Sequence, residues 1–399
     1  MNTLTALCAI GAEKVLGNEI KQLGYTLCAH GRGAGTPGRV YFSGDDDALY
    51  RANLCLRTAD RVYLRLASFE APDFDALFDG VYAIDWQDLF HKDARIIVDK
   101  VRTHRSRLAS EHSIQAVVHK AVYQKLGHAW RMSSLPETGS AFDIRVYVEH
   151  DTAEILLDLS GAPLYRRGYR TDGGPAPIRE TLAAALLQLM CWRRKTPLHD
   201  PFCGSGTIAC EAALYAYNAA PGFGRSFALE NLAFFNAERA HELRCKEAEK
   251  IQPDCQARIT GTDIDSEAVA RSRANAERAC VTAGRALNLI DSSARVVRPD
   301  FAQADFTELS APYDTGMILG NPPYGERLGD AEQARELYQR MHCLYRNFPG
   351  WDMGFITAHS EFETAFGVQA QSARKLKSGN LDTCFYLYKR RNIPNGHSR

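Results

Sequence analysis

The chain has 399 residues, of which 45% are hydrophobic and 24% charged, and its basic and acidic side chains balance to a formal net charge of zero. This length and composition allow two or three domains with proper cores and exclude a largely disordered chain. The longest nearly apolar stretch, 182–192, is about half the length of a membrane span and contains Gln188, so we expect no association with a membrane.

The cysteines and the N-terminus indicate the compartment. Eleven cysteines are present, an odd number, and no two of them form a C-x-x-C pair, so neither a disulfide framework nor a zinc site is indicated. The N-terminus lacks the basic, apolar and small-residue order of a signal peptide. We therefore expect a cytoplasmic protein that binds no metal.

The first 160 residues show two small α+β patterns in succession. In residues 1–68, short apolar runs at 4–10, 40–42 and 62–66 alternate with helical patterns at 13–23 and 48–59. In residues 69–160, an extended run at 96–101 and an amphipathic helix at 114–126 precede a hairpin pattern at 142–159 that turns near His150 and Asp151. The sequence thus predicts two small domains before residue 161.

Positive charge is concentrated in this part of the chain and just after it. From Arg95 to Arg131, eight Lys or Arg face two acids, and 8 minus 2 gives +6. A second basic cluster, mixed with tyrosines, occupies residues 165–170. Both clusters can meet a nucleic-acid phosphate backbone, although such charge runs are also typical of solvated helix faces. The arginines that we predict to contact RNA are Arg102, Arg105, Arg107, Arg166, Arg167 and Arg170.

The pattern changes after a segment rich in Gly and Pro at 161–176, which we interpret as a basic linker. In residues 177–399, strands alternate with longer helices, as in a doubly wound parallel sheet of the Rossmann type. An insertion at about 219–250, rich in Phe and in charge, can be a substrate-facing lid or an elaborated helix pair, and we favour the helix pair.

A glycine-rich loop follows the first strand of this C-terminal domain. Residues 197–207 form a short strand and a turn whose glycines, Gly204 and Gly206, allow a ligand close to the backbone at the start of a helix. A Walker loop is excluded because the loop contains no lysine. A dinucleotide loop remains possible, with Ala209 at the third glycine position.

Three carboxylates favour a different ligand for this loop. Asp200 ends the first strand, where it can bind a positively charged amino group that a pyrophosphate cannot supply. Asp263 ends the next strand and can accept both ribose hydroxyls. Asp305 can accept from an adenine amino group while Phe306 packs on the base. Each acid alone can be a solvated loop residue, but the three in this order favour a ligand that combines adenosine with an amino acid, as S-adenosylmethionine does.

The stretch at 317–327 carries the predicted chemistry. A buried strand ends at Asn321-Pro322-Pro323-Tyr324, because prolines cannot donate to a ladder, and this leaves a rigid polar step at the sheet edge. The side-chain oxygen of Asn321 and the carbonyl of Pro322 can accept the two hydrogens of an exocyclic amine and direct its lone pair at a methyl donor. Tyr324 can stack on a base taken out of its helix.

In order, the motifs Asp-Pro-Phe-Cys-Gly-Ser-Gly-Thr, Gly-Thr-Asp-Ile-Asp and Asn-Pro-Pro-Tyr-Gly-Glu-Arg resemble the class I methyltransferase domain of THUMP-containing RNA methyltransferases. The closest resemblance is to the group that makes N2-methylguanosine in bacterial 23S ribosomal RNA. The resemblance implies a ferredoxin-like domain at 1–68, a THUMP RNA-binding domain at 69–160 and a methyltransferase domain at 177–399. It assigns the target base to Asn321, Pro322, Pro323 and Tyr324, and the cofactor to Asp200, Pro201, Cys203, Gly204, Gly206, Thr207, Asp263, Ile264, Asp305, Phe306 and Asn321.

Several alternatives stay open at this stage. The Asn-Pro-Pro-Tyr step also serves methylation of adenine N6 and of glutamine side chains, so the choice of guanine depends on the resemblance alone. Transfer RNA is an alternative substrate to ribosomal RNA or a pre-ribosomal particle. A non-catalytic RNA-binding or assembly factor with a vestigial cofactor pocket is an alternative of another class. The sequence does not indicate an oligomeric state.

Overall fold

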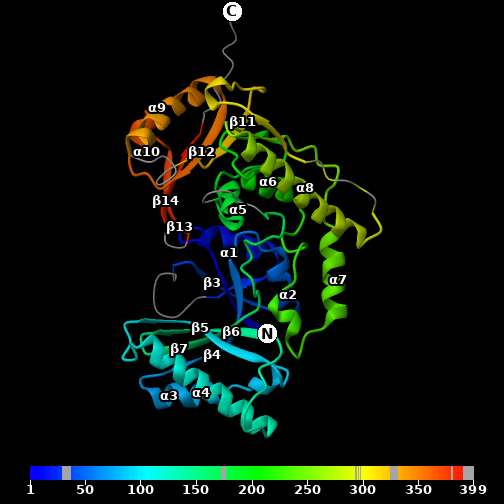
Figure 1. Ribbon diagram of the computed structural model, residues 1–399, viewed down its shortest axis with the longest axis vertical. Helices are drawn as coiled ribbons and strands as arrows, with labels where there is room; N and C mark the ends of the chain where they lie inside the picture. The colour runs from blue at the N-terminus through cyan, green and yellow to red at the C-terminus, as the bar shows by residue number, and fades with distance from the viewer. Residues whose placement is uncertain are drawn as a thin grey trace, which may run out of the picture.

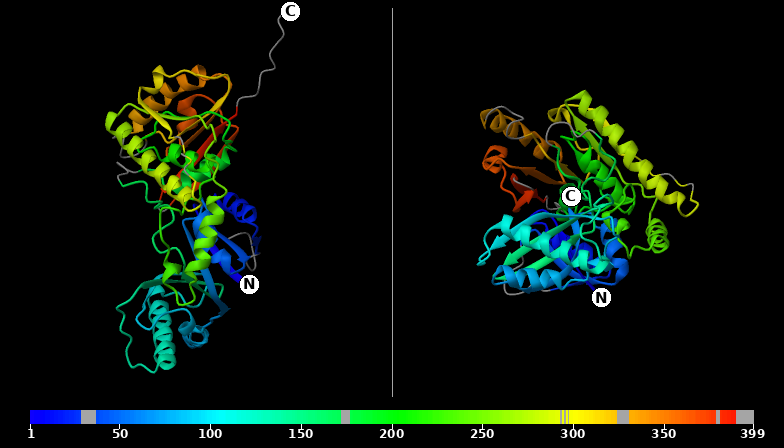
Figure 2. Two further views of the ribbon diagram at one scale, coloured as in Figure 1. Left: turned by 90° about the vertical axis from the view of Figure 1, so that its right-hand side faces the viewer. Right: turned by 60° about the horizontal axis from the view of Figure 1, so that its bottom comes forward.

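The structure is a computed structural model that describes residues 1–28, 37–171, 177–292, 294, 296, 298–323, 331–378 and 381–389. Two α/β parts lie one above the other along the long axis of the molecule, with the N-terminal elements in the lower part (Figure 1). Figure 2 shows the same division from two further directions. No helix in the described part of the chain is long and apolar enough to cross a bilayer.

One continuous sheet forms the lower part. Its strand order is β2-β3-β1-β4-β7-β6-β5, with β5 and β6 parallel and the other neighbours antiparallel. The long strand β4 pairs with β1 near its start and with β7 along most of its length, so it belongs to both small domains. The expected boundary at 68/69 therefore lies within a strand that the two domains share. The strands are β1 (Asn2–Leu7), β2 (Thr26–Leu27), β3 (Arg39–Gly44), β4 (Arg61–Glu70), β5 (Arg95–His104), β6 (Ala141–Glu149) and β7 (Thr152–Asp158).

Helices cover the apolar face of this sheet. The expected helices at 13–23, 48–59 and 114–126 are confirmed as α1 (Glu13–Gln22), α2 (Asp46–Cys55) and α4 (Glu111–Trp130). A further helix, α3 (Phe74–Tyr82), and a short 3₁₀ helix, η1 (Trp86–Asp88), pack beside α4. Side-chain caps fix where α2, α3 and α4 begin, because the side chains of Asp45, Asp73 and Ser110 each accept a hydrogen bond from the first turn.

The upper part is a doubly wound sheet, as predicted, with two antiparallel strands at one edge. The strand order is β10-β9-β8-β11-β12-β14-β13, where the first five are parallel and the β13–β14 hairpin is antiparallel to its neighbours. These strands are β8 (Leu198–Asp200), β9 (Ile259–Asp263), β10 (Asp300–Gln303), β11 (Gly316–Gly320), β12 (Trp351–Thr357), β13 (Ser372–Ser378) and β14 (Leu381–Tyr388).

Both faces of this sheet are buried. Consecutive residues of β11 show it, since Ile318 belongs to one apolar core and Leu319 to the other. The core that contains Leu319 includes α5 (Glu180–Leu189), α6 (Thr207–Ala216) and α8 (Ser266–Asn288), whereas the core of Ile318 includes α9 (Ala331–Asn347) and α10 (Phe362–Phe366). Figure 1 shows these two groups of helices on opposite sides of the strands. The carboxyl ends of β8, β9, β10, β11 and β12 consequently meet at one edge.

The insertion after α6 joins the two parts. It contains a 3₁₀ helix, η2 (Ala228–Asn231), and one α-helix, α7 (Ala237–Ala248), so the expected helix pair is wrong. Helix α7 lies beside α2 of the N-terminal domain (Figure 1). Arg239 pairs with Asp47 at 2.5 Å, and Glu247 pairs with Arg51 at 3.0 Å.

A second link connects the β13–β14 hairpin to the N-terminal domain. The backbone N–H groups of Ile10 and Lys377 each donate to the other residue's carbonyl at 3.0 Å. The Glu13 carboxylate holds the loop around Ile10, since it accepts from the backbone N–H of Gly11 at 2.9 Å and of Gly38 at 2.7 Å. This edge of the upper sheet is thus attached to the N-terminal domain.

Candidate active site

The glycine-rich loop between β8 and α6 has the backbone that its sequence requires. Gly206 caps α6 in the left-handed region with φ of 77°, where a Cβ would approach Ser272 and Phe301 to about 3 Å. Side chains of α8 hold the loop from behind, because Ser272 Oγ donates to the Gly204 carbonyl and Asn275 Nδ2 to the Ser205 carbonyl, both at 2.8 Å. The loop is preformed with its outer side toward a cavity.

That cavity has a volume of about 1200 Å³ and lies at the carboxyl ends of the parallel strands. Of the predicted site residues, Gly206 and Pro322 do not line it, and Tyr324 lies outside the described residues. The predicted residues that line it are Asp200, Pro201, Cys203, Gly204, Thr207, Asp263, Ile264, Asp305, Phe306, Asn321 and Pro323. Residues more than 120 positions apart in the sequence are thus brought together around one space.

The three predicted acids differ in their surroundings. Asp200 is buried, with 1% of its surface exposed, and burial raises the pKa of its carboxyl to about 8. Asp263 is held by two backbone donors, Gly204 N at 2.9 Å and Asp265 N at 3.0 Å. Asp305 caps a 3₁₀ helix, η3 (Phe306–Glu308), and accepts from Arg340 at 3.2 Å. Asp263 and Asp305 therefore have fixed orientations, whereas Asp200 has a buried carboxyl that a cation can charge.

Apolar side chains lie near Asp263 and Asp305. Ile264 is 68% exposed although it is large and apolar, and Phe306 packs against Phe202 with ring centroids 5.2 Å apart. Both Ile264 and Phe306 line the cavity. This end of the cavity can hold a flat heterocycle between apolar surfaces, with carboxylates at its edge.

Asn321 has a side-chain oxygen that is buried and has no hydrogen-bond partner among the residues that the structure describes. Leaving such an acceptor unpaired costs about 1–3 kcal/mol, so its presence in a cavity wall indicates a site for a donor. The prolines after it fix its position, since Pro322 is buried and the Pro323 carbonyl accepts from the Tyr338 hydroxyl at 3.2 Å.

The predicted RNA-contacting arginines fall into two groups. Arg102, Arg105 and Arg107 are exposed at the end of β5 and in the turn that follows it. Arg102 pairs with Glu111 and Arg107 with Asp151, both at 2.9 Å, and the two arginine side chains remain more than half exposed. These cations are accessible to a phosphate.

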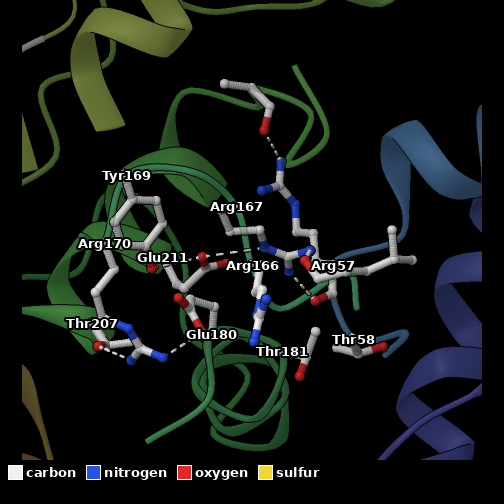
Figure 3. Close-up of polar contacts among 12 residues, drawn as sticks. Arg57, Thr58, Arg166, Arg167, Tyr169, Arg170, Glu180, Thr181, Thr207 and Glu211 are labelled. Atoms are coloured by element: carbon white, nitrogen blue, oxygen red, sulfur yellow. Dashed lines mark hydrogen bonds and ion pairs between the residues drawn. The ribbon is translucent and has the colours of Figure 1, made fainter. Parts of the chain in front are cut away.

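The second group has different surroundings (Figure 3). Arg167 is 3% exposed, pairs with Glu211 at 3.5 Å and donates to the carbonyl oxygens of Leu164 and Arg57. The prediction that Arg167 contacts RNA is therefore wrong, because its guanidinium lies in the protein interior.

Arg170 is partly buried, and protein atoms engage its guanidinium. It donates to the Ile178 carbonyl at 2.8 Å and to Thr207 Oγ1 at 3.2 Å, and it pairs with Glu180 at 3.0 Å. An RNA contact stays a prediction for Arg170, and also for Arg166, which is exposed. Leu164 and Tyr169 are also buried, so the described part of the expected linker, 161–171, is packed structure that supports the cofactor loop through Thr207.

The sequence did not single out several other cavity residues. Arg179 and Leu182 reach the cavity from the start of α5, Ile356 from β12, Ala358 from just after β12, and Thr383 from β14. Leu182, Ile356, Ala358 and Thr383 are neutral residues that carry no motif, and Arg179 is a single arginine outside the motifs that point to the cofactor. Among the described residues, no group of three or more His, Cys, Asp or Glu is placed to hold a metal ion.

This fold and site define a class I methyltransferase domain attached to an RNA-binding module. In family comparisons, residues 167–386 match the RMKL-like methyltransferase domain, residues 3–63 the RlmL ferredoxin-like domain and residues 71–158 the THUMP domain. The chain belongs to the RMKL-like methyltransferase family. It is an RNA methyltransferase, and S-adenosylmethionine is its methyl donor.

Individual relatives match over nearly the whole chain. The Bacillus subtilis (strain 168) protein "Putative RNA methyltransferase YpsC" is 38% identical over 392 residues, which cover 97% of this chain and 95% of that protein. The structure of the methyltransferase SMU.472 complexed with SAH is 33% identical with a TM-score of 0.84, covering 98% of this chain and 99% of that one. A Listeria monocytogenes structure titled as a predicted N6-adenine-specific DNA methylase is 36% identical with a TM-score of 0.85, covering 98% and 96%.

Proposed function

We propose that this enzyme transfers a methyl group from S-adenosylmethionine to the exocyclic N2 amine of a guanine in large-subunit (23S) ribosomal RNA. The observation that carries the proposal is the buried side-chain oxygen of Asn321 at the cavity wall, which has no hydrogen-bond partner among the described residues. An amine on the base edge can donate to that acceptor, and the remaining donors and acceptors of the base can contact the adjacent polar backbone.

The proposed mechanism relies on positioning. Bound S-adenosylmethionine would supply an electrophilic methyl group. We assign its amino group to Asp200, its ribose hydroxyls to Asp263 and its adenine to Asp305, Ile264 and Phe306. Asn321 Oδ1 would accept one amine hydrogen, which helps to localise the lone pair on nitrogen and fixes its direction. The second acceptor expected from the sequence, the Pro322 carbonyl, belongs to a buried residue that does not line the cavity. No strong general base is required, because the proton leaves after the amine has become cationic.

The choice of base and of RNA depends on family resemblance. The ferredoxin-like domain match and the motif order support guanine and ribosomal RNA, whereas the name of the Listeria relative supports adenine N6. The THUMP domain and the exposed arginines of β5 support RNA as the substrate in either case. Transfer RNA is the alternative carrier of the guanine.

We further infer that the reaction takes place in the cytoplasm, on free ribosomal RNA or on an assembling particle. All eleven cysteines lie within the described residues and are free thiols, which supports a reducing compartment.

Mass analysis of nucleosides tests the proposed function. Ribosomal and transfer RNA from a strain that lacks the gene are incubated separately with the purified enzyme and labelled S-adenosylmethionine, then digested to nucleosides. We expect labelled N2-methylguanosine from 23S ribosomal RNA with the wild type and none with Asn321→Ala, which should still bind S-adenosylmethionine normally. Labelled N6-methyladenosine, or label confined to transfer RNA, would replace the proposed substrate; normal turnover by Asn321→Ala would refute the role of Asn321.

A further inference from the structure

The cations around the cavity are divided between its two ends. Three arginines among the described lining residues are Arg179, Arg271 and Arg340. Arg271 pairs with Asp265 at 3.3 Å, and Arg340 pairs with Asp305 at 3.2 Å. Asp265 and Asp305 both line the cavity at the end that we assign to the adenosine. The charges of Arg271 and Arg340 are therefore neutralised within the cofactor site.

Arg179 has a different kind of partner. Its Nη1 lies 3.4 Å from Asp60 Oδ2, and Asp60 belongs to the N-terminal domain and does not line the cavity. Asp60 also accepts a hydrogen bond from Thr181 Oγ1 at 2.5 Å. The guanidinium carbon of Arg179 lies 4.8 Å from the centre of the Tyr165 ring, and the side chain is 36% exposed. A guanidinium stacked on an aromatic ring keeps its N–H edge available, and that edge fits the oxygens of a phosphate.

The position of Arg179 is on the side of the cavity that faces the N-terminal domain. The backbone N–H of Asp60 donates to the Leu7 carbonyl at 2.6 Å, three residues before Ile10, which bridges to the β13–β14 hairpin. The other described lining residues from this hairpin and from β12 are Ile356, Ala358, Leu381 and Thr383, none of them charged. An anion at this end would meet Arg179 without a carboxylate from those strands.

The cavity has room for more than the cofactor. Its volume of about 1200 Å³ exceeds the roughly 300–1000 Å³ that is usual for a pocket with one small ligand. A nucleotide of an RNA strand brings its phosphate with it, and this negative charge must lie near the acids of the site. A cation at the entrance is needed to offset that repulsion.

We propose that Arg179 binds the backbone phosphate next to the target nucleotide and so positions the base at Asn321. Asp60 and the Tyr165 ring hold the guanidinium in place until the phosphate engages its free edge. The proposal rests on the RNA substrate of the proposed function, but it does not depend on which base is methylated.

The test compares Arg179→Ala, Arg179→Lys and Asp60→Asn with the matched control Arg298→Ala, which removes an exposed arginine paired with Glu277 away from the cavity. Methyl transfer from tritiated S-adenosylmethionine to total RNA of the deletion strain is measured over a range of salt concentrations. RNA binding is measured in parallel with the same RNA, and cofactor binding by calorimetry.

We expect Arg179→Ala to lower kcat/KM for RNA by about tenfold or more and to flatten the dependence of log K for RNA on log salt by the equivalent of about one neutralised phosphate. Cofactor affinity should not change. Arg179→Lys keeps the charge and should retain the salt dependence, and Asp60→Asn should retain it as well because the guanidinium remains. Arg298→Ala should behave as the wild type.

A merely structural role for the Arg179–Asp60 pair predicts a different pattern. Asp60→Asn would then reduce activity as strongly as Arg179→Ala, and neither variant would alter the salt dependence; that result would overturn the proposal. If Arg179→Ala does not fold, an unchanged kcat/KM for Arg179→Gln would overturn it. A wild-type product other than N2-methylguanosine would refute the proposed base and leave this proposal standing, so the two failures are distinguishable.

Discussion

Asp200 is the residue whose charge depends most on the ligand. Its carboxyl accepts a hydrogen bond from Phe202 N at 3.1 Å, and burial raises its pKa to about 8, with nearby Asp263 adding to the rise. With this raised pKa, the protonated form of the carboxyl is favoured in the free protein at neutral pH. A cationic amino group beside it favours the ionised form, so binding below pH 8 must release that proton.

This linkage predicts how cofactor affinity changes with pH. As pH rises toward about 8, the carboxyl no longer has to lose a proton, so affinity for S-adenosylmethionine should increase by up to about tenfold per pH unit and then level off. Calorimetry on the wild type and on Asp200→Asn measures it. The amino group of S-adenosylmethionine itself titrates near pH 8. Dividing the affinity of the wild type by that of Asp200→Asn at each pH cancels this contribution of the ligand. A ratio that does not vary with pH would contradict the assignment of Asp200.

Some of the site residues could be placed from sequence motifs, and others could not. Asp200, Asp263 and Asn321 follow buried strands, and strand ends of a parallel sheet meet at one edge, so their convergence follows from the sequence. The burial of Arg167 does not follow from the sequence. Its partner Glu211 is 44 positions away on α6, and composition alone does not distinguish a paired, buried arginine from a solvated one.

The segment at 161–171 is packed against the rest of the protein, although its Gly and Pro content predicted a linker. Replacing Arg167 with methionine would leave Glu211 buried with a hydrogen bond from Tyr169 and no cation paired with it in the described structure. Removal of one partner of a buried pair typically costs about 3–5 kcal/mol, so we expect the free energy of unfolding to fall by that amount. Denaturant unfolding followed by fluorescence checks it.

The adjacent residue provides the control for that experiment. Arg166→Ala changes an exposed side chain and should alter the free energy of unfolding by no more than about 0.5 kcal/mol. If Arg167→Met proves as stable as Arg166→Ala, the buried pair is not what holds this segment in place.

Other elements could be predicted to different degrees. The strands and helices with strong periodicity were found, and the parallel sheet followed from their alternation. Helix α3 was missed, although Asp73 followed by apolar residues at 74, 77, 78 and 81 is a capped amphipathic pattern. The role of α7 was not readable, because its polar face pairs with Asp47 and Arg51, about 190 residues earlier in the chain.

Over the whole molecule, the cavity and the exposed arginines of the THUMP domain belong to different parts. Strand β5 and the turn after it, which carry Arg102, Arg105 and Arg107, belong to the lower sheet, and Figure 1 shows β5 in the lower part. The cavity lies at the strand ends of the upper sheet. Helix α7, through its pair with Asp47, and the Ile10–Lys377 bridge connect one part to the other. RNA held by these arginines would therefore be presented to the cavity by a rigid frame.

Truncation of these three arginines to alanine tests that arrangement. Phosphate contacts position RNA without reading its bases, so binding should weaken to a similar degree for unrelated RNA sequences. The slope of log K against log salt should flatten by about 0.7–0.9 for each phosphate that the variant no longer neutralises. The KM for RNA should rise, while cofactor affinity and the turnover at saturating RNA stay close to those of the wild type, because the cavity is untouched.

The matched control replaces Arg193, Arg194 and Lys195, a basic run that precedes β8 and so lies at the opposite edge of the upper sheet from the cavity. This control also removes three positive charges, but from a surface to which we assign no RNA contact. If both triple variants flatten the salt dependence equally, the effect reflects net charge alone. The triple alanine variant of Arg102, Arg105 and Arg107 could instead bind RNA as the wild type does, with an unchanged melting temperature. The three arginines would then be only a solvated surface, and RNA must reach the cavity along another face.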